Sequence, residues 1–172
     1  MSKKYSYKDI SGWFLSKESM TPKKLQKLTY YAEAWANALL GEGILSDTSF
    51  QAWVHGPVSP ELWNDYKEYG WNEIEQLKPN DEKFNKNILE LLDAVWTTYG
   101  DKSGYELEAI SHSEEPWLKA RNGLSEFEIS TKIIDPADMK TYYRSIYSGG
   151  LILVLNTTFS TQITMNFHSF FI

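Results

Sequence analysis

Residues 21–41 have the sequence TPKKLQKLTYYAEAWANALLG, which predicts the clearest helix of the chain. Thr21 offers a hydroxyl for the N-cap, and Pro22 suits the first helical position. Apolar residues then recur at steps of three and four, which turns one stripe of the helix toward a core. That stripe consists of Leu25, Leu28, Ala32, Trp35 and Leu39. Gly41 is a typical C-terminal stop signal. We expect the stripe to serve packing rather than contact with a partner.

Similar signals predict further helices on both sides of this one. The expected ranges are 7–15, 59–70, 81–99 and 135–147. Ser103 and Glu106 form a capping box, which predicts a short helix after them. Ser113 is the expected N-cap of another short helix, which carries a buried Trp117 and ends at Gly123.

Strand signals are sparse. Residues 50–54 alternate aromatic and small side chains, and residues 130–134 are rich in β-branched side chains. These two segments are expected to pair into a small sheet. Residues 1–148 are therefore predicted to form a mainly α, single compact helical domain of about six helices with a minor β element.

The composition bounds the class of protein. The chain has 172 residues, of which 15% are aromatic, so one domain with a substantial core is expected. No cysteine is present, which excludes disulfides, a thiolate nucleophile and cysteine-bound metals. The net charge of -6 argues against a surface for nucleic acid. The N-terminus lacks the apolar stretch of a secretory signal, so a cytoplasmic location is expected.

The charge distribution changes near the C-terminus. All 17 Lys and Arg and all 23 Asp and Glu lie at or before Arg144, and residues 149–172 form an uncharged apolar tail. Its apolar run, residues 151–155, is far shorter than the roughly 20 residues that span a membrane. Three interpretations stay open: two added strands, an exposed aggregation-prone tail, or sequence foreign to the ancestral domain. The abrupt change at a Gly-Gly pair favours the third.

The sequence offers little support for catalysis. His55, His112 and His168 lack the spacing that places two imidazoles on one metal ion. His112 lies near Glu114 and Glu115, but these acids are better explained as residues that favour a helix N-terminus. Phosphate-binding glycine loops are absent as well. We therefore expect no catalytic residue, no metal, no cofactor and no enzymatic activity.

Five residues are candidates for contact with a partner. Lys23 and Lys27 lie one helical turn apart in a basic cluster, which is either a docking face for an acidic protein or a solvated surface. Trp53 and His55 precede a rigid turn and form a plausible contact patch. Arg121 has five donors that suit either carbonyl groups of the protein or a partner's carboxylate.

The turn itself is expected to be structural. Gly56 tolerates backbone angles that other residues avoid, and Pro57 has a restricted backbone angle. Together they are expected to stop the strand before them and direct the chain into the next helix.

Three stretches combine these residues in a specific order: 24–35, 52–62 and 111–121. Their sequences fit the patterns KLQKLxYYAxAW, AWxxGPVxPEL and SHSExPWxxAR. In order and spacing they resemble the Panacea-domain family of SocA-like antitoxins and phage-associated proteins. The resemblance covers roughly residues 5–148, and Thr29 and Trp63 depart from the usual pattern.

The resemblance implies an antitoxin that neutralises a cognate toxin by direct protein–protein binding. It also implies, for at least one branch of the family, an adaptor that delivers the toxin to a cellular protease. Neither an enzymatic activity nor a cofactor is implied. Two alternatives stay open: a phage or prophage inhibitor of a host protein, and a DNA-binding autoregulator. The second would need a basic recognition helix, which the sequence does not contain.

Overall fold

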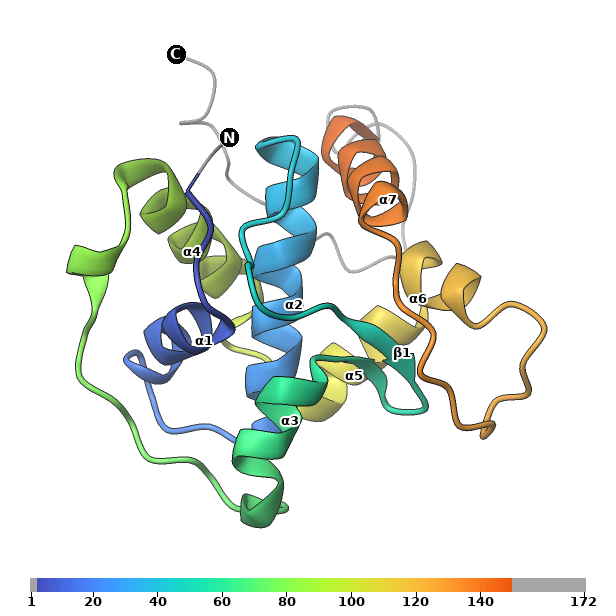
Figure 1. The fold of residues 1–172 in the computed structure, drawn as a ribbon, viewed down its shortest axis with the longest axis horizontal. Coiled ribbons are helices and arrows are strands. Elements are labelled where there is room, and N and C mark those ends of the chain that lie inside the picture. Colours follow the sequence, from blue (N-terminus) through green and yellow to red (C-terminus); the bar gives the residue numbers. More distant parts are fainter. Residues whose placement is uncertain (1–2, 150–172) are drawn as a thin grey trace.

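The computed structural model describes residues 3–149, which form seven α-helices, two 3-10 helices and one two-stranded sheet (Figure 1). The α-helices are α1 (Tyr7–Leu15), α2 (Pro22–Leu39), α3 (Pro60–Tyr66), α4 (Lys86–Tyr99), α5 (Gly104–His112), α6 (Glu115–Ala120) and α7 (Pro136–Gly149). The 3-10 helices are η1 (Lys67–Tyr69) and η2 (Asp81–Lys83), and the strands are β1 (Gln51–Trp53) and β2 (Gly56–Val58). The mainly α prediction is confirmed. Apart from Gly149, the predicted apolar tail lies outside the described residues.

Helix α2 is the centre of the fold. It packs against α1 and α4 on one side and against α7, α5 and the hairpin on the other (Figure 1). The predicted stripe is buried except for Leu39, which is partly buried. Burial extends beyond the stripe, because Tyr30, Tyr31, Ala34 and Ala36 are fully buried as well. Almost the whole circumference of α2 therefore lies inside the protein.

Most predicted helix caps are confirmed. The Thr21 hydroxyl accepts a hydrogen bond from the Lys24 N–H, and the Ser59 hydroxyl accepts one from the Leu62 N–H. The capping box of Ser103 is present in both directions. These side chains satisfy N–H groups that have no partner within the helix.

The predicted cap at Ser113 is wrong. Its hydroxyl donates to the carbonyl oxygen of Ile110 at 2.7 Å, so it serves the C-terminal end of α5. The N-cap position of α6 belongs to Glu114, whose side chain makes no capping hydrogen bond. One helix ends and the next begins within two residues, and the Ile110 carbonyl that the hydroxyl reaches also accepts from the Ser113 N–H at the end of the first helix.

Two predicted helices are divided in the structure. The range 59–70 contains α3 and η1 and ends at Gly70, whose φ is +55°. The range 81–99 begins with η2, and α4 starts afresh with Asn85 as its N-cap.

The small sheet differs from the prediction in its main pairing. Strand β1 pairs antiparallel with β2, and Ala52 lies opposite Pro57. The prediction that Gly56 and Pro57 form a turn after the strand is wrong, because the chain turns at Val54 and His55 and these two residues begin β2. The predicted pairing with residues 130–134 is present as a single bridge between Gln51 and Ile133. Sequence analysis missed β2 because Gly and Pro are depleted in strands.

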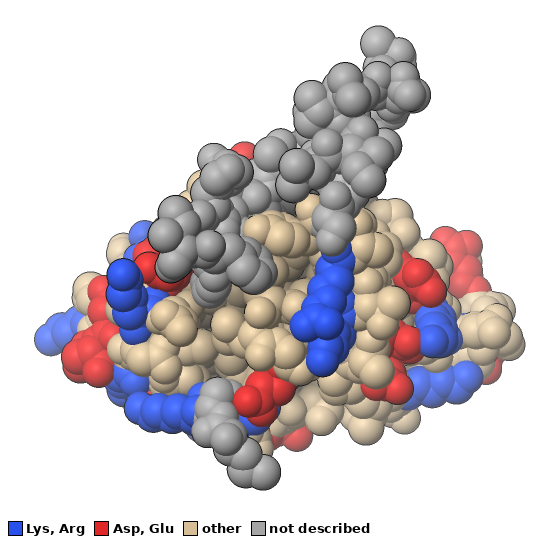
Figure 2. Space-filling view, turned by 90° about the horizontal axis from the view of Figure 1, so that it is seen from above, with Lys and Arg blue, Asp and Glu red and all other residues tan. Residues whose placement is uncertain are grey.

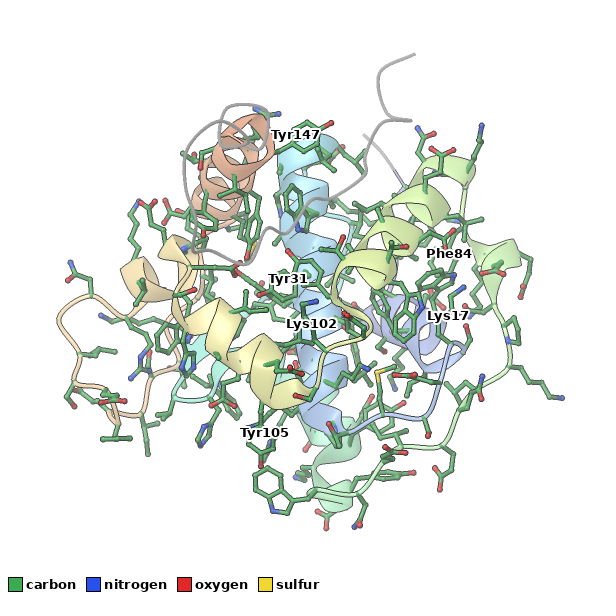
Figure 3. The ribbon with its side chains drawn as sticks, turned by 180° about the vertical axis from the view of Figure 1, so that it is seen from behind. Lys17, Tyr31, Phe84, Lys102, Tyr105 and Tyr147 are labelled. Carbon is green, nitrogen blue, oxygen red and sulfur yellow. The ribbon has the colours of Figure 1, made fainter. Side chains whose placement is uncertain are left out.

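A cluster of aromatic rings fills the space between α2, α4 and α7. Tyr31 stacks on Tyr99 with ring centroids 3.9 Å apart, and its labelled side chain lies in the middle of the molecule in Figure 3. The Trp35 indole donates to the Tyr99 hydroxyl at 3.1 Å. Tyr143 of α7 is fully buried against the same rings.

No helix in residues 3–149 has the length and apolar character needed to cross a membrane.

Candidate partner-binding surface

The three motif stretches meet at the β1–β2 hairpin. The first contributes side chains from α2, the second forms the hairpin and α3, and the third runs from α5 through α6. Each outer stretch holds the hairpin through hydrogen bonds between its side chains and hairpin backbone groups. The motifs therefore define one structural unit.

Lys27 of α2 binds the hairpin turn from beneath. Its side chain is 1% exposed, and its Nζ donates to the carbonyl oxygens of His55 and Pro57 at 2.6 and 3.1 Å. Burial lowers the pKa of Lys27 to about 7, although the nearby Glu108 carboxylate acts in the opposite direction.

Gly56 makes this close approach possible. Its φ is +98°, a value that side chains other than glycine rarely permit. A Cβ atom at this position would lie 2.6 Å from Lys27 Nζ. The prediction of a conformational requirement at Gly56 agrees with this geometry.

Gln26 holds the exit from β2. Its Nε2 donates to the carbonyl oxygen of Ser59, and its Oε1 accepts from the Ser59 N–H, both at 2.9 Å. Since Ser59 also caps α3, the amide fixes the start of that helix relative to α2.

Trp117 and Arg121 hold β1 from the opposite side. The Trp117 indole donates to the carbonyl oxygen of Trp53 at 3.0 Å, and Arg121 donates to that of Ala52 at 3.0 Å. Arg121 also binds three carbonyl oxygens of the following loop, those of Ser125, Glu126 and Glu128. Arg121 is 5% exposed, and its guanidinium lies 5.2 Å from the Trp117 ring.

The outer side of this unit carries exposed aromatic side chains. We call the residues Lys23, Trp53, His55, Trp63, Trp71 and Tyr105 the aromatic surface. Trp71 is 74% exposed and Tyr105 is 64% exposed, yet their rings stack with centroids 6.1 Å apart. Figure 3 shows Tyr105 on α5 at the outside of the molecule. On the hairpin side, Trp53 contacts Trp63 at 5.5 Å between ring centroids.

Glu108 connects the two parts of the aromatic surface. Its carboxylate pairs with Lys23 and lies 2.9 Å from Nδ1 of His55 on the hairpin. The Lys23 ammonium lies over the Tyr105 and Trp71 rings, 4.2 and 5.5 Å from their centroids. These contacts hold the exposed rings in place, and hydrogen bonds to Lys23 and His55 help to lower the pKa of Glu108.

The structure separates the five predicted contact residues into two groups. Lys23, Trp53 and His55 belong to the aromatic surface, whereas Lys27 and Arg121 are buried and bind backbone carbonyls. The lysines thus do not form a common exposed basic face, because Lys27 turns toward the hairpin. Contact of any of these residues with a partner stays a prediction.

Two exposed members of the surface, Trp71 and Tyr105, were not predicted from the sequence. Trp71 and Tyr105 are 34 positions apart in the chain, and neither belongs to a motif stretch. A signal was available for Trp71, which directly follows the predicted helix end at Gly70 in a segment rich in acidic residues. No such signal marks Tyr105, which follows an ordinary helix start.

Glu114 takes a different role from the one expected. Its carboxylate accepts hydrogen bonds from the hydroxyls of Tyr143 at 2.6 Å and Tyr31 at 3.2 Å. Burial raises the pKa of Glu114 to about 7.

His112 stacks on Trp117 with ring centroids 4.1 Å apart. In residues 3–149, no three His, Asp or Glu side chains gather as a metal site would require.

The fold is a mainly helical domain built on one buried central helix. One motif stretch forms the hairpin, and the two outer stretches hold it. By sequence, the chain belongs to the family described as "Antitoxin SocA-like, Panacea domain", which matches residues 25–118, just over half of its length. The matched range includes most of α2, the whole hairpin and the start of α6. None of the curated proteins or solved structures matches the chain.

Proposed function

We propose that this protein is an antitoxin that neutralises a cognate toxin by direct binding, without enzymatic activity. Membership of the SocA-like antitoxin family is the observation that carries the proposal. We further propose that the aromatic surface is the contact face. Contact with a protease, as an adaptor, would involve a second surface and is not needed for this proposal.

The aromatic surface has the composition of a binding site. Tryptophan and tyrosine are enriched among the residues that dominate binding energy at protein interfaces. Large rings bury much apolar area on contact and lose few rotatable bonds. The stacking of Trp71 on Tyr105 and the cation above them restrict these rings before any partner arrives. Both features favour tight association with another protein.

The charge pattern supports a protein partner rather than nucleic acid. The chain carries a net charge of -6. On the face shown in Figure 2, acidic and basic side chains are intermixed with uncharged ones over the part that the described residues form. Phosphate backbones are bound by continuous basic surfaces, so this pattern does not suit them.

Co-expression with the products of adjacent genes tests the proposal. Each neighbour is expressed alone and then together with this protein, while growth is recorded and the complex is purified by a tag on the antitoxin. We expect one neighbour to be toxic alone, to be neutralised by the pair and to co-purify at a fixed stoichiometry. Full toxicity of every toxic neighbour despite co-expression would contradict antitoxin function.

Variants of the antitoxin then test the contact face. The double variant Trp71→Ala, Tyr105→Ala removes the exposed stack, and Leu77→Ala is the matched control because Leu77 is an exposed apolar residue outside the aromatic surface. Loss of rescue in the double variant but not in the control supports this face. Rescue by both variants would place the contact elsewhere and leave the antitoxin function standing.

A further inference from the structure

Residues 132–134 run beside β1, and in the described part of the chain their outer side, together with residues 129–131 before them, carries unpaired backbone groups. The Ala52 N–H donates to the carbonyl oxygen of Lys132, and the Ile134 N–H donates to that of Phe50, both at 2.8 Å. Hydrogen-bonding groups point alternately to the two sides of an extended chain, so the groups of Thr131 and Ile133 point away from β1. Within residues 3–149, the backbone N–H and C=O groups of Thr131 and Ile133 have no hydrogen-bond partner.

The side chains along this edge face solvent and core in turn, except that Lys132, which strict alternation would turn toward the core, is exposed. Ser130 is 7% exposed and Ile134 is 1% exposed, whereas Ile129 is 87% exposed and Ile133 is 60% exposed. Thr131 is also exposed, so the outward positions form an apolar row with one hydroxyl at its centre. The segment leads from the loop after α6 into α7 at the margin of the molecule (Figure 1).

An edge of this kind is a template for pairing with another strand. Proteins usually protect such edges with proline, with charges that point inward or with a covering loop. Here the free backbone groups and the exposed isoleucines coincide at residues 129–133. The occupant must therefore be an extended segment with apolar side chains at alternate positions.

We propose that this edge pairs antiparallel with the same edge of a second copy of the chain, around a two-fold axis at Thr131. In this register Ile129 lies opposite Ile133 of the second copy, and the same pair recurs on the other side of the axis. Thr131 lies opposite its own copy. Each of these cross-strand pairs is a favourable one in antiparallel sheets.

The charges of the edge suit the same register. Lys132 lies diagonally opposite Glu128 of the second copy, a separation that long side chains bridge. Neither residue belongs to an ion pair in the described part of the chain, although one oxygen of the Glu128 carboxylate accepts a hydrogen bond from the Ser125 N–H. A self-complementary edge, in which apolar residues meet apolar residues and a cation meets an anion twice, is what a two-fold dimer requires. This assembly is independent of the proposed toxin contact, which uses a different surface.

Sedimentation of the full chain over a concentration series tests the dimer. We expect the wild-type protein to associate reversibly to a dimer. Ile133→Pro removes an N–H that makes no internal hydrogen bond. In the dimer this N–H would donate one hydrogen bond from each copy, so losing both should weaken association about tenfold. Ile133→Ala keeps that N–H and is the matched control, with a smaller effect. Equal melting temperatures show that all three proteins are folded.

A charge-reversal cycle provides a test that leaves the backbone unchanged. Glu128→Lys and Lys132→Glu should each weaken the dimer several-fold, and the double variant should restore it, because each pair regains opposite charges. A wild-type protein that stays monomeric at all concentrations overturns the proposal. This holds also if the edge is covered only when the toxin is bound. Association that survives both Ile133→Pro and the single reversals also overturns it, because the contact then lies elsewhere.

Discussion

The Nζ atom of Lys27 lies 2.6 Å from the carbonyl oxygen of His55, so a buried amine on the central helix holds the turn of the hairpin. The same atom binds the carbonyl oxygen of Pro57. The backbone of the turn therefore has its polar groups directed inward, while the His55 side chain points outward and is 75% exposed. The backbone of His55 thus contributes to stability, whereas its side chain is presented to solvent.

Lys27→Met should destabilise the protein by about 1–3 kcal/mol, because two buried carbonyl oxygens lose their donor. Urea unfolding measures the loss. Lys86→Met is the matched control, since the Lys86 side chain is 87% exposed in its pair with Glu90 and its loss should cost less. Equal losses in the two variants would contradict a special role for the buried amine.

The stability difference between wild type and Lys27→Met should depend on pH. The pKa of Lys27 is about 7 in the folded protein and 10.5 for an ordinary lysine. Between these values the unfolded chain binds more protons than the folded protein, so the wild type gains stability relative to the variant as pH rises from 7 to 10.5. Unfolding in urea at several pH values measures this, and a flat difference would argue against a lowered pKa.

The stability difference between wild type and Glu114→Gln should depend on pH with the opposite sign to that of Lys27→Met. Burial raises the pKa of Glu114 from 4.5 to about 7, so the folded protein binds more protons than the unfolded chain between these values. The wild type should lose about 3 kcal/mol relative to the glutamine variant as pH rises from 4.5 to 7. Thermal melting of both proteins across this range checks the sign, and parallel curves would contradict the assignment.

Arg121→Met should destabilise the protein by about 2–4 kcal/mol, because one guanidinium binds four backbone carbonyls. Hydrogen exchange should increase in residues 125–128 and in β1. Arg144→Met is the matched control, since Arg144 binds a single carbonyl, that of Ala38, from an exposed position. A comparable loss in both variants would show that the extra carbonyl contacts contribute little.

Trp71→Ala combined with Tyr105→Ala should leave the free energy of unfolding within about 1 kcal/mol of wild type, since both rings are largely exposed. If these rings contact the toxin, its dissociation constant should rise about 30-fold or more. Calorimetric titration of the purified toxin measures the binding change. An unchanged dissociation constant in a folded variant would exclude this pair from the interface.

The helices were predictable because their signals are local. Thr21 with Pro22, and Ser103 with Glu106, mark helix starts through groups that lie within four residues of one another. The cap at Ser113 failed although it rests on the same kind of signal, because α6 begins one residue later than expected, with Glu114 at its N-cap position, and the Ser113 hydroxyl donates to the end of α5.

The site was less predictable because its contacts join distant parts of the chain. Helical spacing places Lys23 and Lys27 together, but only the hairpin, about 30 residues later, decides that Lys27 is buried. Glu114 becomes a buried acceptor through Tyr143, which arrives 29 residues later on α7. Residue patterns within one segment carry no record of such partners.

The hydrogen bonds that hold the β1–β2 hairpin have a consequence for how a new binding specificity arises. The groups that hold it, such as Gln26, Lys27 and Arg121, are directed inward and bind backbone atoms, which substitutions of the exposed side chains leave in place. Exposed positions such as His55 and Trp71 can therefore change identity without changing the support beneath them. A scaffold of this kind separates folding from recognition, so that selection for a new partner can act on the exposed side chains alone.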